Sequence, residues 1–167
     1  DNIVKGLNPK SNAEYGLIIV GAGPAGISAS LEAKKHKIKA LTLEQDSLGG
    51  TVFTFPRAKI VMTSAMDLPL HGKIKLFETS KAELLNLWTS VLENNGIKIH
   101  ENKKVEQIIP ENGGFVVHTK DGSKYTTQRV LLGIGRRGTP RKLNIPGEEM
   151  PNVAYRLLEP ELIQGKK

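Results

Sequence analysis

A glycine-rich turn between two apolar segments limits the folds open to this chain more than any other part of its sequence. Residues 21–26 read Gly-Ala-Gly-Pro-Ala-Gly, which fits the spacing G-x-G-x-x-G. The apolar run Tyr15–Val20 precedes the turn, and its length and β-branched residues predict a strand buried on both faces. Small and apolar residues follow from Pro24 to about Lys35 and predict a helix that can lie close to a sheet.

Each glycine of the turn has a physical task in such a unit. Gly21 permits a tight turn, Gly23 lets the backbone approach a pyrophosphate without a Cβ clash, and Gly26 lets the helix pack closely on the strand. Pro24 suits the first turn of a helix, where its missing N–H is not needed. The amides of that turn would point at phosphates, with the helix dipole favouring their charge. Glycine turns are common, so the pattern carries weight here because a strand precedes it and a helix follows it.

A second apolar strand, Ile38–Glu44, completes a strand–helix–strand unit and ends on a carboxylate. Glu44 lies 18 residues after Gly26, where an acidic residue accepts hydrogen bonds from ribose hydroxyls and repels a 2′-phosphate. The unit therefore predicts a site for FAD or NAD rather than NADP. The alternative is a solvated Glu beside Asp46. We expect this strand end to be exposed without ligand, so that Glu44→Ala weakens binding more than folding.

The next elements follow a long loop. Residues 45–79 contain Gly49-Gly50 and two prolines, and they predict a loop with one short strand or turn near Ile60–Met62. The run Ser80–Glu83 is a capping box that predicts a helix start, and Asn95-Gly96 predicts its end. Trp88 on this helix is interpreted as a core residue. A strand at Ile97–Ile99 is expected next.

The second half of the chain changes to a period of two. Alternation and turn signals predict a three-stranded antiparallel meander, with strands at Val105–Ile109, Phe115–Thr119 and Lys124–Thr126. A further apolar strand is predicted at Arg129–Ile134, which leads into Gly135. The fold class expected is α/β: a Rossmann-like domain with a parallel sheet, flanking helices and an inserted antiparallel meander.

Composition excludes several other chemistries. The 167 residues fit one domain, or two at most. The absence of cysteine excludes disulfides, Cys-ligated metals and thiol catalysis within this chain. No apolar run is long enough to span a membrane. The net charge of +7 comes without an aromatic platform or nucleic-acid motif, so an attraction for phosphates or an acidic protein is the preferred interpretation. We expect no metal site, because the histidines lack an i, i+4 carboxylate or histidine partner; they are His36, His71, His100 and His118.

Taken together, these motifs resemble the FAD domain of thioredoxin-reductase-like pyridine nucleotide oxidoreductases. This group includes thioredoxin reductases, bacillithiol disulfide reductases and ferredoxin–NADP reductases of that type. The resemblance covers roughly residues 15–160. It is carried by the glycine turn, Glu44, Gly49-Gly50, the meander, and the run Gly133–Pro140 followed by Ile145–Glu148.

The resemblance implies which residues meet the cofactor. It places the diphosphate on the glycine turn, the adenosine ribose on Glu44, the ribityl chain along the next glycine pair, and adenine against the backbone at the start of the meander. The cofactor-binding residues expected are Gly21, Gly23, Pro24, Ala25, Gly26, Glu44, Gln45, Gly49, Gly50, Thr51, Val105, Gly133 and Gly135. The segments 55–57 and 62–64 fall near the flavin ring in the family, and a packing role for them stays open. We identify no catalytic residue.

The family also implies a larger protein. Residues 1–14 are expected to be a lead-in, 15–147 the first part of a discontinuous FAD-binding domain, and 148–167 a linker towards an NAD(P)H domain absent from this chain. The first residue, Asp1, suggests an excised piece, and we expect this piece alone to be inactive. The basic cluster of Arg136, Arg137, Arg141 and Lys142 is either a solvated linker or a contact for phosphate or an acidic partner.

For the complete protein, the resemblance implies an NAD(P)H-dependent oxidoreductase that passes electrons through FAD to a disulfide, a ferredoxin or a similar acceptor. A small acidic protein is one acceptor that we expect. We also expect the complete protein to be a cytoplasmic homodimer and to bind no nucleic acid. The alternative is a non-catalytic module that binds an adenine dinucleotide.

Overall fold

The structure is a computed structural model that describes residues 2–55, 60–62, 64–76, 78–135, 142–155 and 165. Its helices are α1 (Asn2–Lys5), α2 (Pro24–Lys35) and α3 (Lys81–Asn94). Its strands are β1 (Tyr15–Val20), β2 (Ala40–Leu43), β3 (Ile60–Met62), β4 (Met66–Leu68), β5 (Gly72–Ile74), β6 (Glu78–Ser80), β7 (Ile99–His100), β8 (Val105–Glu111), β9 (Gly114–Thr119) and β10 (Lys124–Leu132).

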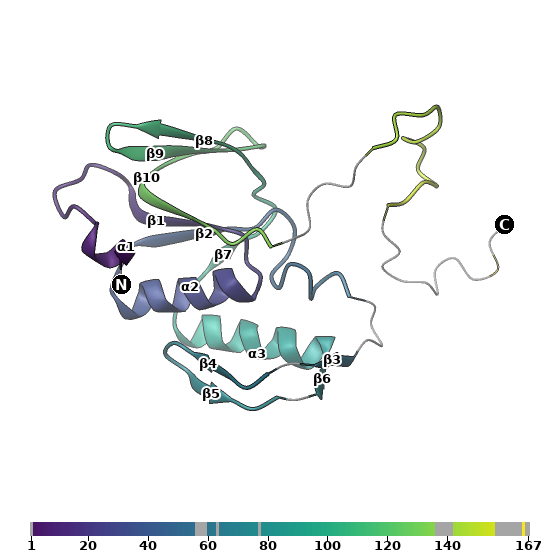
Figure 1. Ribbon diagram of the computed structural model, residues 1–167, viewed down its shortest axis with the longest axis horizontal. Helices are drawn as coiled ribbons and strands as arrows, with labels where there is room; N and C mark the ends of the chain where they lie inside the picture. Colours follow the sequence, from purple (N-terminus) through teal and green to yellow (C-terminus); the bar gives the residue numbers. More distant parts are fainter. Residues whose placement is uncertain are drawn as a thin grey trace.

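The central sheet has the strand order β7-β2-β1-β10-β9-β8 (Figure 1). Neighbouring strands from β7 to β10 are parallel, and β10, β9 and β8 pair in antiparallel fashion. The parallel sheet, the flanking helices and the three-stranded meander confirm the fold class expected from the sequence. The predicted limits of α2, Pro24 and Lys35, are also confirmed.

The meander and the parallel sheet share one strand, and here the prediction of two separate strands is wrong. β10 runs continuously through the residues between Lys124–Thr126 and Arg129–Ile134. Thr127 joins the two parts, because it pairs with Phe115 on β9 and with Tyr15 on β1. The polar pair at 127–128 interrupts the apolar pattern, yet backbone pairing on both sides keeps the strand intact.

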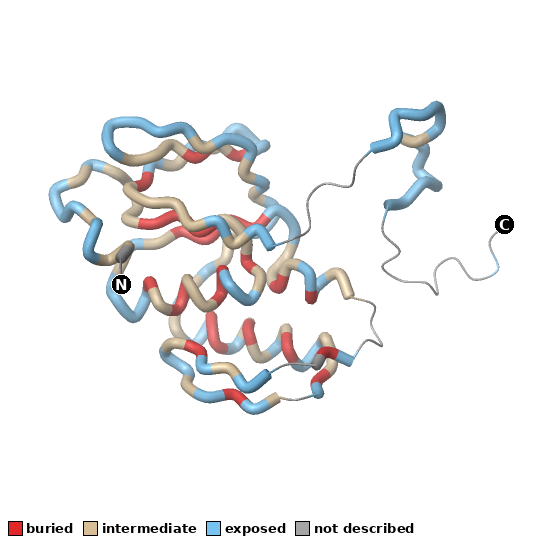
Figure 2. The backbone as a smooth tube through the Cα atoms, viewed as in Figure 1, coloured by how far each residue is buried: buried red, intermediate tan, exposed pale blue. Residues whose placement is uncertain are grey.

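Both faces of the parallel strands are covered, which explains their continuous apolar sequences. Leu17 and Ile19 of β1 face α2, where they cluster with Ala33. Ile18 points the other way and clusters with Val117 of β9, because the meander folds over the opposite face (Figures 1 and 2). The buried residues drawn red in Figure 2 therefore run through the middle of this layered unit.

A third cluster lies on the outer side of α2. Ile27 of α2 packs with Leu84, Trp88 and Val91 of α3, which confirms Trp88 as a core residue. The predicted capping box forms: Ser80 Oγ accepts a hydrogen bond from Glu83 N at 3.2 Å, and Ser80 N donates to Glu83 Oε2 at 2.8 Å.

The segment 45–79 has more structure than the single short strand predicted. β3 forms at the expected place and pairs with β6, and β4 and β5 form a hairpin beside α3 (Figure 1). Each of these strands has three residues. Strands this short show almost no periodicity, so the sequence pattern missed three of them.

Two smaller predictions need correction. β7 begins at Ile99 rather than Ile97. The statement that no histidine has a carboxylate four residues away is also wrong, because His36 Nε2 lies 2.9 Å from Glu32 Oε1. This pair sits on the exposed end of α2, and the described residues contain no cluster of three metal-ligating side chains.

The first residues of the chain pack against the unit that follows. Ile3 joins the cluster beside α2, and Arg129 Nη2 donates to Gly6 O at 2.7 Å.

No helix found in the described ranges has both the length and the hydrophobicity needed to cross a membrane.

Candidate functional site

The carboxyl ends of β1, β2 and β10 meet at a cavity of about 460 Å³. Ligands of open α/β sheets bind at this edge, outside the carboxyl ends of the parallel strands. The cavity is lined by Val20, Gly21, Gly23, Pro24, Ala25, Leu43, Glu44, Gln45, Asp46, Gly50, Thr51, Thr54, Lys103, Lys104, Val105, Leu132, Gly133, Ile134 and Gly135. Every residue expected from the sequence to meet a cofactor is among them, except Gly26 and Gly49. Residues far apart in the chain thus converge on one site.

Gly26 lies behind the cavity, where three backbone segments touch. A Cβ on Gly26 would fall 1.9 Å from Gly21 O, so only glycine fits between α2 and the end of β1. A Cβ on Gly21 would fall 2.5 Å from Gly133 O, and Gly21 also has a φ of +101°. These contacts join the glycine turn to the end of β10 and match the packing role expected for Gly26.

Gly23 faces the cavity and, unlike Gly21 and Gly26, has free space where a side chain would lie. A Cβ built on Gly23 would meet nothing within 4 Å, and its backbone is extended, with φ −76° and ψ −174°. Gly23 is also the N-cap of α2, and no side chain caps that helix end. The open space and the uncapped amides form a cradle that suits an anion such as a diphosphate. The residues present therefore fit the expected group.

Gly49 and Gly50 bring the following loop against the glycine turn. Gly49 N donates to Ala22 O at 2.9 Å, and a Cβ on Gly49 would lie 2.4 Å from Leu85 of α3. A Cβ on Gly50 would lie 3.4 Å from Gly23 Cα. Gly49 is thus a packing position, whereas Gly50 borders the cavity.

Glu44 is more deeply built into the site than the sequence suggests. Its residue is only 5% exposed, which contradicts the expectation of an exposed strand end. Its Oε2 accepts a hydrogen bond from Ala22 N at 2.7 Å, and its Oε1 accepts one from Asp46 N at 3.0 Å. The carboxylate therefore holds the glycine turn to the end of β2, while its remaining lone pairs can still accept ribose hydroxyls.

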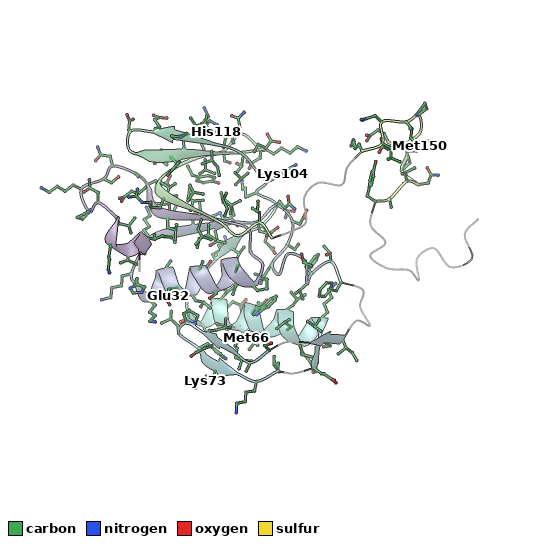
Figure 3. The ribbon with its side chains drawn as sticks, in the orientation of Figure 1. Glu32, Met66, Lys73, Lys104, His118 and Met150 are labelled. Atoms are coloured by element: carbon green, nitrogen blue, oxygen red, sulfur yellow. The ribbon has the colours of Figure 1, made fainter. Side chains whose placement is uncertain are left out.

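Sequence reasoning missed one wall of the cavity. Lys103 and Lys104 line it beside Val105, and Thr54 lines it beside Thr51. Figure 3 labels Lys104 just before the start of β8, beside the turn that joins β9 to β10. One sequence signal could have identified the two lysines: they directly precede Val105, which is among the expected cofactor-binding residues.

Some sequence predictions fall outside the residues that the structure describes. They concern Pro56 and Arg57, Thr63, and the basic residues Arg136, Arg137 and Arg141. Phe55 packs beside the α3 cluster.

A larger cavity of about 580 Å³ lies beside α3, and it contains none of the predicted cofactor residues. Its walls are mostly apolar and include Leu48, Phe53, Leu85 and Ile97. It has neither a glycine turn nor an uncapped helix end, so it lacks the features that the sequence associates with a dinucleotide site.

Two reductases that are similar to this chain extend well beyond the part that matches it. A ferredoxin–NADP reductase of Ignicoccus hospitalis is 27% identical over 150 residues, which cover 90% of this chain and 46% of that protein. Bacilliredoxin reductase of Bacillus subtilis is 25% identical over 142 residues, which cover 83% of this chain and 44% of that protein. The chain thus spans less than half the length of these relatives.

Solved structures share the fold. Bacillithiol disulfide reductase from Staphylococcus aureus matches with a TM-score of 0.70 and 21% identity, covering 87% of this chain and 45% of that one. Thioredoxin reductase from T. acidophilum matches with a TM-score of 0.57 and 27% identity, covering 80% of this chain and 39% of that one. The sequence profile described as pyridine nucleotide-disulphide oxidoreductase matches residues 18–167. With the glycine cradle and the mixed sheet in place, the chain therefore belongs to the pyridine nucleotide-disulphide oxidoreductase family.

Proposed function

We propose that this chain is the FAD-binding part of an NAD(P)H-dependent flavoprotein oxidoreductase. The observation that carries the proposal is the open cradle at Gly23, which faces a cavity bordered by both Glu44 and Gly133. Family membership supports FAD and a nicotinamide nucleotide as the cofactors.

Each part of the cavity then has a task. The amides at the start of α2 bind the diphosphate, and Glu44 accepts hydrogen bonds from the adenosine ribose. Gly50 and Thr51 border the ribityl chain, and the backbone of Val105 meets adenine. Bound FAD would supply hydride acceptance from the nicotinamide and onward electron transfer. The described residues bind and orient, and none of them is assigned a proton-transfer role.

The proposal extends to the complete protein. Residues 15–147 form the first part of a discontinuous FAD-binding domain, residues 1–14 precede it, and residues 148–167 lead towards an NAD(P)H-binding domain. The electron acceptor is a disulfide, a ferredoxin or another small acidic protein, for which the net charge of +7 is favourable. We further propose that the complete protein is a cytoplasmic homodimer. The absence of cysteine in this chain is compatible with a reducing compartment.

Gly23→Val in the complete protein tests the binding site. The extended backbone at Gly23 accepts any side chain, and the new side chain enters only the cavity. We expect a folded protein that purifies without flavin, whereas the wild type purifies yellow and releases FAD on denaturation. The measurements are the flavin absorbance per protein and a thermal melt of the ligand-free form.

Gly26→Ala is the matched comparison, because its Cβ would strike Gly21 O and disrupt the fold itself. A folded Gly23→Val protein that still holds stoichiometric FAD would show that the cradle at Gly23 does not bind the diphosphate. A wild type that holds FAD but oxidises no NAD(P)H would favour the non-catalytic module instead.

A further inference from the structure

The wall missed by sequence reasoning is fixed on both sides by backbone hydrogen bonds. It consists of Lys103 and Lys104, which were missed, and Val105, which was expected; we call residues 103–105 the adenosine wall because they border the cavity beside Glu44. Lys103 N donates to Glu44 O at 2.8 Å on one side. On the other side, Lys120 N donates to Lys104 O at 2.8 Å. The wall therefore bridges β2 and the turn between β9 and β10.

That turn carries a carboxylate with several donors around it. Thr119 Oγ1 donates to Asp121 Oδ1 at 2.5 Å, and Ser123 N donates to the same oxygen at 3.3 Å. Ser123 Oγ donates to Asp121 Oδ2 at 3.2 Å. The ammonium of Lys103 also donates to Oδ2 and forms an ion pair with it. Asp121 thus connects the turn directly to the adenosine wall.

Both partners of this ion pair are charged near neutral pH. The hydrogen bond from Lys103, followed by that from Thr119, holds the pKa of Asp121 far below its usual range. The hydrogen bond to Asp121 raises the pKa of Lys103. Without Asp121, the Lys103 ammonium would lose its carboxylate partner while its residue still lined the cavity.

We propose that Asp121 is a positioning residue for cofactor binding: hydrogen bonds already hold the backbone of the adenosine wall, and Asp121 holds the Lys103 side chain of that wall in the position that receives the adenine half of FAD. Asp121 does not line the cavity, so it acts through Lys103. This inference rests on the proposed function, because it assumes that the cavity binds the adenosine end of a dinucleotide.

Backbone hydrogen bonds also hold the turn, besides the bonds to the Asp121 side chain. Thr119 N donates to Ser123 O at 3.0 Å, and Gly122 N donates to Thr119 O at 2.9 Å, so backbone groups close the turn. Asp121→Asn keeps an oxygen for Thr119 and Ser123 but removes the charge that holds Lys103. The substitution therefore separates positioning of the wall from formation of the turn.

The test uses the complete protein stripped of FAD. Because the Lys103–Asp121 pair is partly exposed to solvent, we expect Asp121→Asn to weaken binding of FAD, and of ADP as a probe for the adenosine half, by about two- to fivefold. At saturating FAD, the kcat and the KM for NAD(P)H should stay unchanged, which a general loss of structure would not allow. Glu32→Gln is the control, because it removes an exposed ion pair on α2 far from the turn in sequence.

Lys103→Met provides the second arm. It should weaken FAD binding on its own, and combining it with Asp121→Asn should add little, because both substitutions remove the same contact. Unchanged FAD affinity in Asp121→Asn, or fully multiplicative effects in the double variant, would overturn the inference. If Asp121→Asn fails to fold, an unchanged FAD affinity in Lys103→Met overturns it instead. Failure of the wild type to bind FAD or ADP would instead reject the proposed function.

Discussion

At the scale of single residues, Glu44 serves the fold and the proposed ligand with the same carboxylate. It is buried at the end of β2, and both oxygens accept backbone hydrogen bonds. One of these bonds holds Ala22, which is fully buried in the middle of the glycine turn. The shape of the cradle therefore depends on Glu44 before any cofactor arrives.

Glu44→Gln should destabilise the ligand-free protein, because an amide has one oxygen and must direct a donor at Ala22 N or Asp46 N. We expect the free energy of unfolding to fall by about 1–3 kcal/mol, the usual cost of leaving a buried polar group unpaired. Urea unfolding of the ligand-free protein measures this loss, with the exposed Glu32→Gln as control. Equal unfolding midpoints for wild type and Glu44→Gln would show that the carboxylate does not hold the turn.

At the scale of elements, α3 depends on its capping box. Hydrogen bonds from Ser80 N and then Ser80 Oγ, with a further one from Thr79, lower the pKa of Glu83 from its ordinary value of 4.5. A carboxyl group with a lowered folded-state pKa stabilises the protein fully above its unfolded pKa, and this contribution disappears as the pH falls through the folded pKa.

Glu83→Gln should therefore be less stable than the wild type near neutral pH, and the difference should shrink as the pH falls below about 4. Urea unfolding midpoints across this pH range provide the measurement. In the same assay at neutral pH, Ser80→Ala should lower the free energy of unfolding by about 1 kcal/mol. A gap between wild type and Glu83→Gln that stays constant with pH would mean that the carboxylate charge contributes nothing to the cap.

At the scale of the whole molecule, the cavity is open where β10 ends. Leu132 and Ile134 line it while remaining 60% and 63% exposed. Further large apolar side chains are exposed in the segment 142–155, among them Leu143 and Ile145. The relatives named above are more than twice as long as the part that matches this chain. We propose that further domains of the complete protein cover these surfaces.

Residues 1–167 alone should therefore show no NAD(P)H oxidation, because the nicotinamide-binding domain is proposed to lie outside them. The measurement is the loss of NADH or NADPH absorbance at 340 nm with FAD and an artificial electron acceptor present. The complete protein in the same assay is the positive control. Turnover by the purified 167-residue chain would show that the proposed division of labour between domains is incorrect.

The chain's local patterns were sufficient for the elements whose signals lie within a few residues. The glycine turn, the start and end of α2, the capping box of α3 and the alternation of β8 and β9 all depend on neighbours along the chain. Together with the family resemblance, which linked Val105 and Gly133 to the same ligand as Glu44, these patterns identified most residues that line the cavity.

Only the tertiary structure decided what distant segments do to one another. It merged two predicted strands into β10, because Thr127 pairs with strands on both sides. It buried Glu44 against Ala22, and it brought Asp121 to Lys103 across the meander. It also paired the three-residue strands beside α3. The physical reason is that hydrogen bonds and burial between residues far apart in sequence leave no periodic trace in the sequence around either partner.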